Sequence, residues 1–426
     1  MNLYSKAGIY ALLVLLIAFS DAKAQPGFDT QRLSRIDEFI THQIKEQHIP
    51  GAVALIIRDN NIIYNKAFGY ADIASGKKMQ VNNIFRIASQ SKAITSLAAM
   101  MLWEENKFLL DDPVSKYIPA FKDPQVLVHF NASDSTWTTR PASRDITIRD
   151  LLRHTSGIAY AAVFSDPVMQ AIYQKAGIPS GIGTTASTLK EKINLLAKLP
   201  LQHDPGEKFT YGLNTDVLGY LVEIWSGRPL DEFLRKRIFE PLEMNDTWFH
   251  LPADKQQQLT TLYENVGQEL KPVTHPIYEG VNPDFPKLNG TYLSGGAGLS
   301  STTGDYAKFL SLFLNKGVYK TKRLVSRKTI ELMLTNQLPD GTGISPLPPQ
   351  PENFRFGLGF GLETPANDYL SPMTVGSFRW DGAFTTFGWA DPQEHIIGLL
   401  FTQEYLSPWW RMGDEFKTLT YQAINY

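Results

Sequence analysis

Cysteine is absent from all 426 residues of the chain. Its absence excludes disulfide bonds, thiolate metal sites, a cysteine nucleophile and a lipid-modified N-terminal cysteine. An excess of charge is absent too, because 41 lysines and arginines stand against 43 aspartates and glutamates. The sequence also has no basic run of the kind that follows a nucleic-acid backbone. We therefore expect no nucleic-acid partner and no chemistry that depends on a thiol.

Three common catalytic signatures are missing as well. No Gly-x-Ser-x-Gly elbow occurs, which disfavours an α/β-hydrolase. None of the 8 histidines forms a His-Glu-x-x-His motif or an i, i+4 pair, so zinc hydrolysis lacks its ligands. No glycine loop of the P-loop or dinucleotide type appears. The sequence predicts neither a metal nor a cofactor.

Long apolar runs are also lacking, apart from one at the N-terminus. Lys6 precedes the apolar stretch Gly8–Phe19, and Ala22-Lys23-Ala24 then supplies a small-x-small cleavage site. The apolar stretch is too short to span a membrane. We expect a signal peptide over residues 1–24, and an exported mature protein, periplasmic or secreted, without an integral membrane segment.

Hydrophobic periodicity divides the mature chain into two parts of different texture. Residues 25–112 and 292–426 combine helical patterns with alternating β-rich runs, and residues 113–291 alternate helical patterns with long polar connections. We expect a single α/β domain over residues 25–426. Its antiparallel β-sheet is flanked by helices, both termini contribute to this α/β lobe, and residues 113–291 form an inserted, mainly helical lobe.

The chemistry centres on a serine that is followed three residues later by a lysine, Ser89 and Lys92. If a helix begins near Ser89, Lys92 lies one turn further on the same face, where its amine activates the serine hydroxyl. The same spacing begins at Ser20, Ser75 and Ser187, but only the helix after Ser89 is apolar on several sides and hence buried. In the alternative interpretation, Ser89 caps the helix and Lys92 reaches solvent.

Longer stretches around this pair resemble a known superfamily. They are Asn82–Leu102, Leu109–Val114, Ile146–Gly157, Pro205–Tyr211, Asp216–Gly219 and Gly295–Leu299. Together they resemble the serine β-lactamase and penicillin-binding-protein superfamily, with the greatest likeness to class C β-lactamases and their esterase relatives. The resemblance covers nearly the whole mature chain. It implies a β-lactamase/transpeptidase-like fold and acyl transfer to Ser89.

The second motif of this superfamily is Tyr-x-Asn, whose tyrosine helps to move the proton of the nucleophile. The literal match begins at Tyr263, in a segment that we interpret as polar helix or loop. Tyr211 has the expected Pro-Gly-x-x-Phe-x-Tyr lead-in and a helix after it, so the resemblance assigns the role to Tyr211. Leu213 stands where the asparagine is expected. Asn214, one residue later, is the candidate replacement in substrate binding.

The third motif, Lys-Thr-Gly, is absent, and Trp380-Asp381-Gly382-Ala383 stands on the corresponding strand. It resembles the Trp-x-Gly of the esterase-like branch, which implies that Trp380, Asp381 and Gly382 bind substrate. A glycine there lets substrate lie against the strand edge. The resemblance also implies an oxyanion hole made by the N–H groups of Ser89 and Ala383. Because Trp380 replaces a cation, we expect a more apolar substrate than a β-lactam.

These features predict a serine hydrolase that cleaves an ester or amide through an acyl-enzyme on Ser89. Lys92 and Tyr211 share the proton, and either could be the base, because each needs its ordinary pKa shifted. The alternative function is a D-alanyl-D-alanine carboxypeptidase, a D-amino-acid peptidase or a weak β-lactamase. A non-catalytic binding protein is disfavoured by the retained Ser, Lys and Tyr. The expected partner is a small-molecule or peptide acyl substrate, and the oligomeric state stays open.

Overall fold

The computed structural model describes residues 27–161, 165–183, 186–267, 269–278, 280–346, 348–351 and 353–425. The expected signal peptide, residues 1–24, lies outside the described residues. Among the described helices, none has the length and apolar character needed to cross a membrane. The expected fold class is confirmed, because the described chain is a mixed α/β structure with a large antiparallel sheet flanked by helices.

The large sheet draws its strands from both ends of the chain. Neighbouring strands are antiparallel throughout, in the spatial order β14 (Gly361–Leu362), β15 (Phe378–Arg379), β16 (Thr386–Asp391), β17 (Ile396–Phe401), β1 (Gly51–Arg58), β2 (Asn61–Asp72) and β3 (Lys77–Lys78). At the centre, β1 of the N-terminal half pairs with β17 near the C-terminus, with Val53 opposite Phe401. These two strands are buried over nearly their whole length, because helices cover both faces of the sheet.

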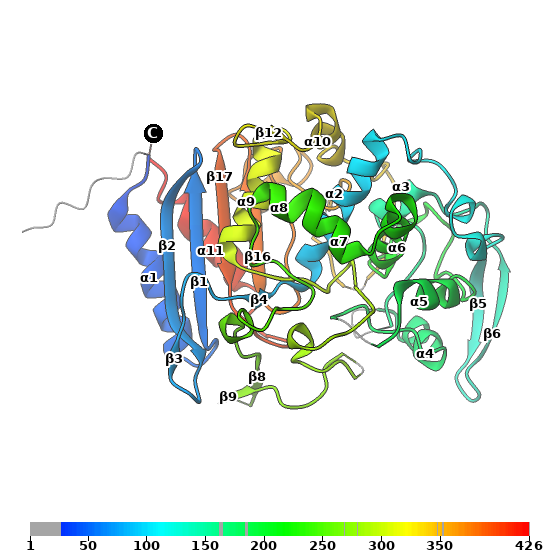
Figure 1. Cartoon of the computed structure of the whole chain (residues 1–426), viewed down its shortest axis with the longest axis horizontal. Helices are drawn as coiled ribbons and strands as arrows, with labels where there is room; N and C mark the ends of the chain where they lie inside the picture. The colour runs from blue at the N-terminus through cyan, green and yellow to red at the C-terminus, as the bar shows by residue number, and fades with distance from the viewer. Residues whose placement is uncertain are drawn as a thin grey trace, which may run out of the picture.

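Helices from the two chain ends cover the outer face of the sheet (Figure 1). There α1 (Thr30–Lys45) packs with α11 (Met412–Tyr421), and the buried residues of α1 recur at helical spacing. On the inner face α9 (Thr303–Leu314) lies against β16, β17 and β1. The next helix along the chain is α10 (Arg327–Met333).

Mainly helical elements fill the other end of the molecule, and the hairpin of β5 (Gln125–Asn131) and β6 (Thr136–Pro141) lies farthest from the sheet (Figure 1). The described helices between β4 and α9 are α2 (Ser91–Glu104), α3 (Ile148–Leu152), α4 (Pro167–Lys175), α5 (Leu189–Leu196), α6 (Asn214–Ser226), α7 (Leu230–Leu234) and α8 (Glu240–Leu242), the last of which is drawn at the sheet end in Figure 1. α2 packs against α6 and α7, so one apolar core continues from the sheet into the helical elements. The expected lobe boundaries stay a prediction.

Short strand pairs connect these parts. They are β4 (Phe85–Arg86) with β10 (Ser300–Ser301), β7 (Lys208–Phe209) with β13 (Gly343–Ile344), β8 (Tyr263–Val266) with β9 (Glu269–Pro272), and β11 (Val318–Tyr319) with β12 (Lys322–Arg323). The strand β8 corrects one expectation, because the segment that begins at Tyr263 is neither helix nor loop. Its first residue is buried, and its register with β9 fixes it as extended chain.

Two segments depart from their local sequence pattern. The helical pattern of Val114–Phe121 gives a pair of 3₁₀ turns, because Pro119 has no amide donor and disfavours helix at the residue before it. The apolar, β-rich run Phe356–Leu362 forms a strand only at Gly361–Leu362. Gly359 interrupts it with φ +106, a conformation that side chains rarely adopt.

Candidate active site

Ser89 lies in a 3₁₀ turn, Ala88–Gln90, that leads directly into the buried helix α2. Strand β4 delivers the chain to this turn through its pairing with β10. Ala88 has φ 39 although it carries a side chain, and such left-handed backbone costs of order 1–3 kcal/mol. A fully buried residue in a strained conformation therefore holds the position immediately before the serine.

The lysine predicted as the partner of Ser89 is brought to it by the first turn of α2. Lys92 Nζ donates to Ser89 Oγ at 3.2 Å and to the carbonyl oxygen of Gly296 at 2.9 Å. The ammonium also lies 4.5 Å from the centre of the Tyr211 ring. Lys92 is buried, so the alternative in which it reaches solvent is wrong. Burial lowers the pKa of Lys92 to about 7, although the nearby carboxylate of Asp216 opposes the shift.

Asp216, in the first turn of α6, faces Lys92 across Gly296. A Cβ on Gly296 would lie 2.9 Å from Asp216 Oδ2 and 3.5 Å from Lys92 Nζ, so only glycine fits between the two groups. Neither oxygen of Asp216 makes a hydrogen bond of good geometry with a described residue, and the Ser294 hydroxyl donates to the carbonyl oxygen of Gly181. Burial raises the pKa of Asp216 to about 6, and the neighbouring Ser294 hydroxyl and the charge of Lys92 oppose that rise.

Tyr211 and Trp380 form another wall of the site around Ser89. Trp380 Nε1 donates to the Tyr211 hydroxyl at 3.1 Å, and the two ring centres lie 5.5 Å apart. Burial raises the pKa of Tyr211, and the hydrogen-bonding groups of Ser89 and Trp380 oppose this rise. A neutral phenol beside a lysine with a lowered pKa makes the lysine the better base of the two at neutral pH.

The backbone before Ser89 packs against the segment that follows β15. A Cβ on Gly382 would lie 2.3 Å from the carbonyl oxygen of Ile87, so this glycine allows two backbones to touch. Its geometric purpose is this contact rather than space for substrate, and Gly382 does not line the cavity described below. The contact places Ala383 beside the cavity, where its N–H makes no backbone hydrogen bond with any described residue. The amide is free for an oxyanion hole with that of Ser89.

Asn214, expected to bind substrate, lies behind the site rather than in it. It is fully buried, its Oδ1 accepts from the Ser156 hydroxyl, and its Nδ2 lies 3.1 Å from Nδ1 of His154. The His154 ring in turn packs 5.1 Å from the Tyr211 ring. Burial lowers the pKa of His154 well below its ordinary value. Asn214 therefore supports the Tyr211 ring through His154.

A cavity of about 900 Å³ opens in front of these groups. Its lining includes Ser89, Tyr211, Trp380, Asp381 and Ala383. Asp381 lies apart from the nucleophile, because its carboxylate accepts from the Gly388 amide and pairs with Arg379 at 3.4 Å. Of the predicted substrate-binding residues, the cavity thus includes Trp380 and Asp381 in its lining.

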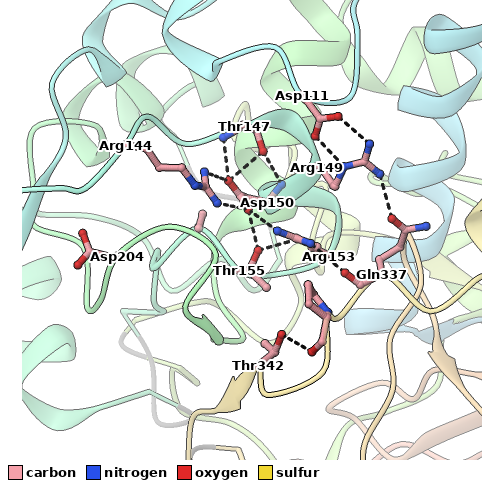
Figure 2. Close-up of polar contacts among 12 residues, drawn as sticks. Asp111, Arg144, Thr147, Arg149, Asp150, Arg153, Thr155, Asp204, Gln337 and Thr342 are labelled. Carbon is pink, nitrogen blue, oxygen red and sulfur yellow. Dashed lines mark hydrogen bonds and ion pairs between the residues drawn. The ribbon is translucent and has the colours of Figure 1, made fainter.

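In the stretch Ile146–Gly157, which resembles the superfamily, polar side chains gather around one buried carboxylate. Figure 2 shows Asp150 at the centre of a cluster, with Arg144 and Arg153 directed toward it. Thr147 Oγ1 and Thr155 Oγ1 also donate to it, at 2.9 Å each. Burial alone would raise the pKa of Asp150, but these partners outweigh it and lower the pKa to about 2. This cluster braces the loop that carries His154.

The other candidate motifs have structural surroundings. The Tyr263 hydroxyl accepts from the Ile73 amide, and Asn265 donates to Glu404, so the literal Tyr-x-Asn match ties strand β8 to its neighbours. Ser75 is an exposed turn residue, and Ser187 is half-buried just before α5. Ser20 lies outside the described residues. In the described ranges, no group of three or more His, Cys, Asp or Glu side chains is placed to hold a metal.

Sequence reasoning missed two residues of this site. Asp216 stands in a stretch that resembles the superfamily, but the sequence did not indicate its role beside Lys92. Tyr160 packs 5.5 Å from Tyr211 and lines the cavity, and no motif indicated it. Both are brought to the site by tertiary packing rather than by spacing along the chain.

Comparisons with known proteins agree with this geometry. An uncharacterized protein of Mycobacterium tuberculosis is 34% identical over 83% of this chain and 86% of its own length. A protein of Escherichia coli O157:H7 named putative D-alanyl-D-alanine carboxypeptidase is 29% identical, over 90% of this chain and 84% of its own. An esterase of Burkholderia gladioli is 28% identical, over 87% and 90%.

A solved structure and a family model extend the comparison. The structure of a hydrolase with promiscuous acyltransferase activity superposes with a TM-score of 0.78 and 27% identity, covering 92% of this chain and 99% of the other. The family model described as Beta-lactamase matches residues 36–411, which include every site residue named above. The chain therefore belongs to the beta-lactamase family, whose fold it shares with esterases and acyltransferases.

Proposed function

We propose that this protein is an exported serine hydrolase that cleaves an ester or an amide through an acyl-enzyme on Ser89. The observation that carries the proposal is the 3.2 Å contact between Lys92 Nζ and Ser89 Oγ, beside Tyr211 in a cavity large enough for a substrate. Export is proposed from the N-terminal sequence alone.

In the proposed reaction, Ser89 Oγ attacks the substrate carbonyl carbon and its proton passes to neutral Lys92. The lowered pKa of Lys92 supports this assignment, because part of the lysine population is uncharged near neutral pH. The N–H groups of Ser89 and Ala383 stabilise the oxyanion. As the bond to the leaving group breaks, a proton reaches that group through Tyr211. Water then attacks the acyl carbon as Lys92 takes a proton from it, and Lys92 passes that proton to Ser89 Oγ as the acyl bond to the serine breaks and the acid leaves.

The wall of the cavity favours an ester over a β-lactam. Trp380 presents an indole whose only polar atom already donates to Tyr211, where a β-lactamase would place a cation for the substrate carboxylate. The cavity lining also includes Ile182, Phe354 and Leu362. We infer that the acyl or alcohol group next to the scissile bond is apolar. The D-alanyl-D-alanine carboxypeptidase alternative is favoured by one observation, the name of the Escherichia coli relative.

A panel of substrates and one probe test these proposals. The mature protein is incubated with a fluorophosphonate, and the adduct is located by mass spectrometry after digestion. Initial rates are measured with p-nitrophenyl butyrate, nitrocefin and a D-Ala-D-Ala peptide. We expect the adduct on Ser89 and turnover of the ester. An adduct elsewhere, or none, contradicts the serine assignment, and turnover of the peptide without the ester favours the carboxypeptidase.

A further inference from the structure

The cavity of the nucleophile continues past Trp380 to a group of charged side chains. Glu363, which follows β14, and Arg379 of β15 line it from the sheet, and Lys417 lines it from α11. The Glu363 amide donates to the Ser377 carbonyl, so Glu363 and Arg379 stand two register positions apart on one face of neighbouring strands. Trp380, the next residue along the chain, donates from its indole Nε1 to the Tyr211 hydroxyl.

The charges at this end of the cavity do not balance. Arg379 pairs with Asp381 at 3.4 Å, and Lys417 pairs with Asp414 at 3.1 Å. Glu363 forms no ion pair with any residue that the structure describes, so two cations face three carboxylates and one negative charge remains. It is 6% exposed, its Oε1 has no hydrogen-bond partner in the described chain, and the neutral Ser371 hydroxyl lies close to its carboxylate.

A buried carboxylate without a charged partner of its own is costly, so its presence calls for a cation that the described chain does not supply. Burial raises the pKa of Glu363, and the charges of Arg379 and Lys417, with the Ser371 hydroxyl, act against that rise. A ligand anion would meet two cations that are already paired. A primary ammonium group, in contrast, brings three donors and the one positive charge that is missing.

We propose that Glu363 forms a subsite for a primary ammonium group of the substrate, at the end of the cavity away from Ser89. The proposal rests on the proposed function and narrows its substrate class to esters or amides that carry an amine on an apolar chain. Gly361, whose Cα faces the Trp380 indole, stands two residues before Glu363, roughly 7 Å along the strand. A chain that reaches from Trp380 to Glu363 needs several methylene groups.

Matched esters test the subsite. Initial rates are compared for p-nitrophenyl 6-aminohexanoate and p-nitrophenyl heptanoate, in which a methyl group replaces the ammonium, and for the p-nitrophenyl monoester of pimelic acid, which ends in a carboxylate. A second pair, 6-aminohexyl acetate and heptyl acetate, places the amine on the alcohol side. For at least one pair we expect kcat/KM for the ammonium ester to exceed that of its neutral match about 10- to 100-fold at pH 7.

Two variants separate Glu363 from the rest of the protein. Glu363→Gln should bring the ammonium ester to within about threefold of its neutral match and leave the neutral rate nearly unchanged. Glu38→Gln, an exposed position on α1, should keep the wild-type preference. If Glu363→Gln does not fold, N-acetylation of 6-aminohexanoate in the wild-type assay decides, because it removes the charge and keeps an N–H donor.

The outcomes distinguish the subsite from the underlying chemistry. Turnover of the neutral esters with no preference for ammonium in either pair overturns the subsite and leaves the hydrolase intact. A preference for the pimelate ester, or an ammonium preference that survives Glu363→Gln, also overturns it. If no ester is turned over and no fluorophosphonate adduct forms on Ser89, the proposed function itself is wrong.

Discussion

Two buried aspartates, Asp150 and Asp216, obey the same physics with opposite results. Each is fully buried, and burial pushes the pKa of each upward. Asp150 is surrounded by donors, which lower its pKa to about 2. Asp216 has no guanidinium partner among the described residues, and its neighbours Ser294 and Lys92 offset burial only in part, so its pKa rises to about 6. Partners, not burial, decide the sign of the shift.

The difference separates a structural carboxylate from one that tunes reactivity. Asp150 fixes the loop behind the site, because removing it would leave Arg144 and Arg153 without their common partner (Figure 2). Asp216 lacks such strong partners and lies near Lys92, so the charge of its carboxylate changes the pKa of the lysine. We expect mutations at the first region to change stability and mutations at the second to change activity.

The largest expected effect is the loss of catalysis in Lys92→Met. Without the amine, no group beside Ser89 accepts its proton at neutral pH, so kcat/KM for p-nitrophenyl butyrate should fall about 10³- to 10⁴-fold. Lys190→Met is the matched control, because Lys190 follows Ser187 at the same spacing but is exposed on α5. A loss smaller than about tenfold would make Tyr211 the base.

Asp150→Asn should produce the largest loss of stability. Removing one member of a buried ionic cluster costs about 3–5 kcal/mol, measured as the free energy of unfolding in urea. Asp111→Asn is the control, because Asp111 pairs with Arg149 through a side chain that is 70% exposed, and it should cost less than about 1 kcal/mol. Equal costs for the two variants would remove the structural role of Asp150.

The sequence predicted what depends on local pattern. The β-rich runs expected within residues 292–426 include β16 and β17 of the sheet, and the apolar helix after Ser89 correctly placed Lys92 inside. The resemblance selected Tyr211 over Tyr263, and the structure places Tyr211 beside Lys92 and Tyr263 in a strand. These features are visible along the chain.

The rest depends on contacts between distant segments. Asn214 lies only three residues from Tyr211, yet the turn of α6 directs it away from the cavity and onto Ser156. Gly382 is needed because another backbone touches it, which spacing cannot reveal. The pKa of Asp216 follows from burial and from the groups that tertiary packing brings to it, which are not visible along the chain.

The pH dependence of stability should carry opposite signs for the two aspartates. Because its folded pKa is raised, Asp216 contributes stability that is present below about pH 4 and is lost as the pH rises through about 6. Asp150 contributes stability that is present above about pH 4 and is lost as the pH falls through about 2. Asp216→Asn should therefore gain about 1–3 kcal/mol relative to wild type between pH 4 and pH 7. Urea unfolding at both pH values measures it, and a relative loss would contradict it.

The smallest expected effect is a shift of the pH–rate profile in Asp216→Asn. The negative charge of Asp216 raises the pKa of Lys92, so its removal lowers that pKa further below the ordinary value of a lysine. Because the acid limb of kcat/KM reports the base of the free enzyme, the limb should move about one pH unit toward acid. Asp111→Asn, far more exposed, should leave the limb in place. A limb that stays fixed in Asp216→Asn would mean that Lys92 does not titrate in the assay, and a shift toward higher pH would mean that Asp216 acts on Tyr211 instead.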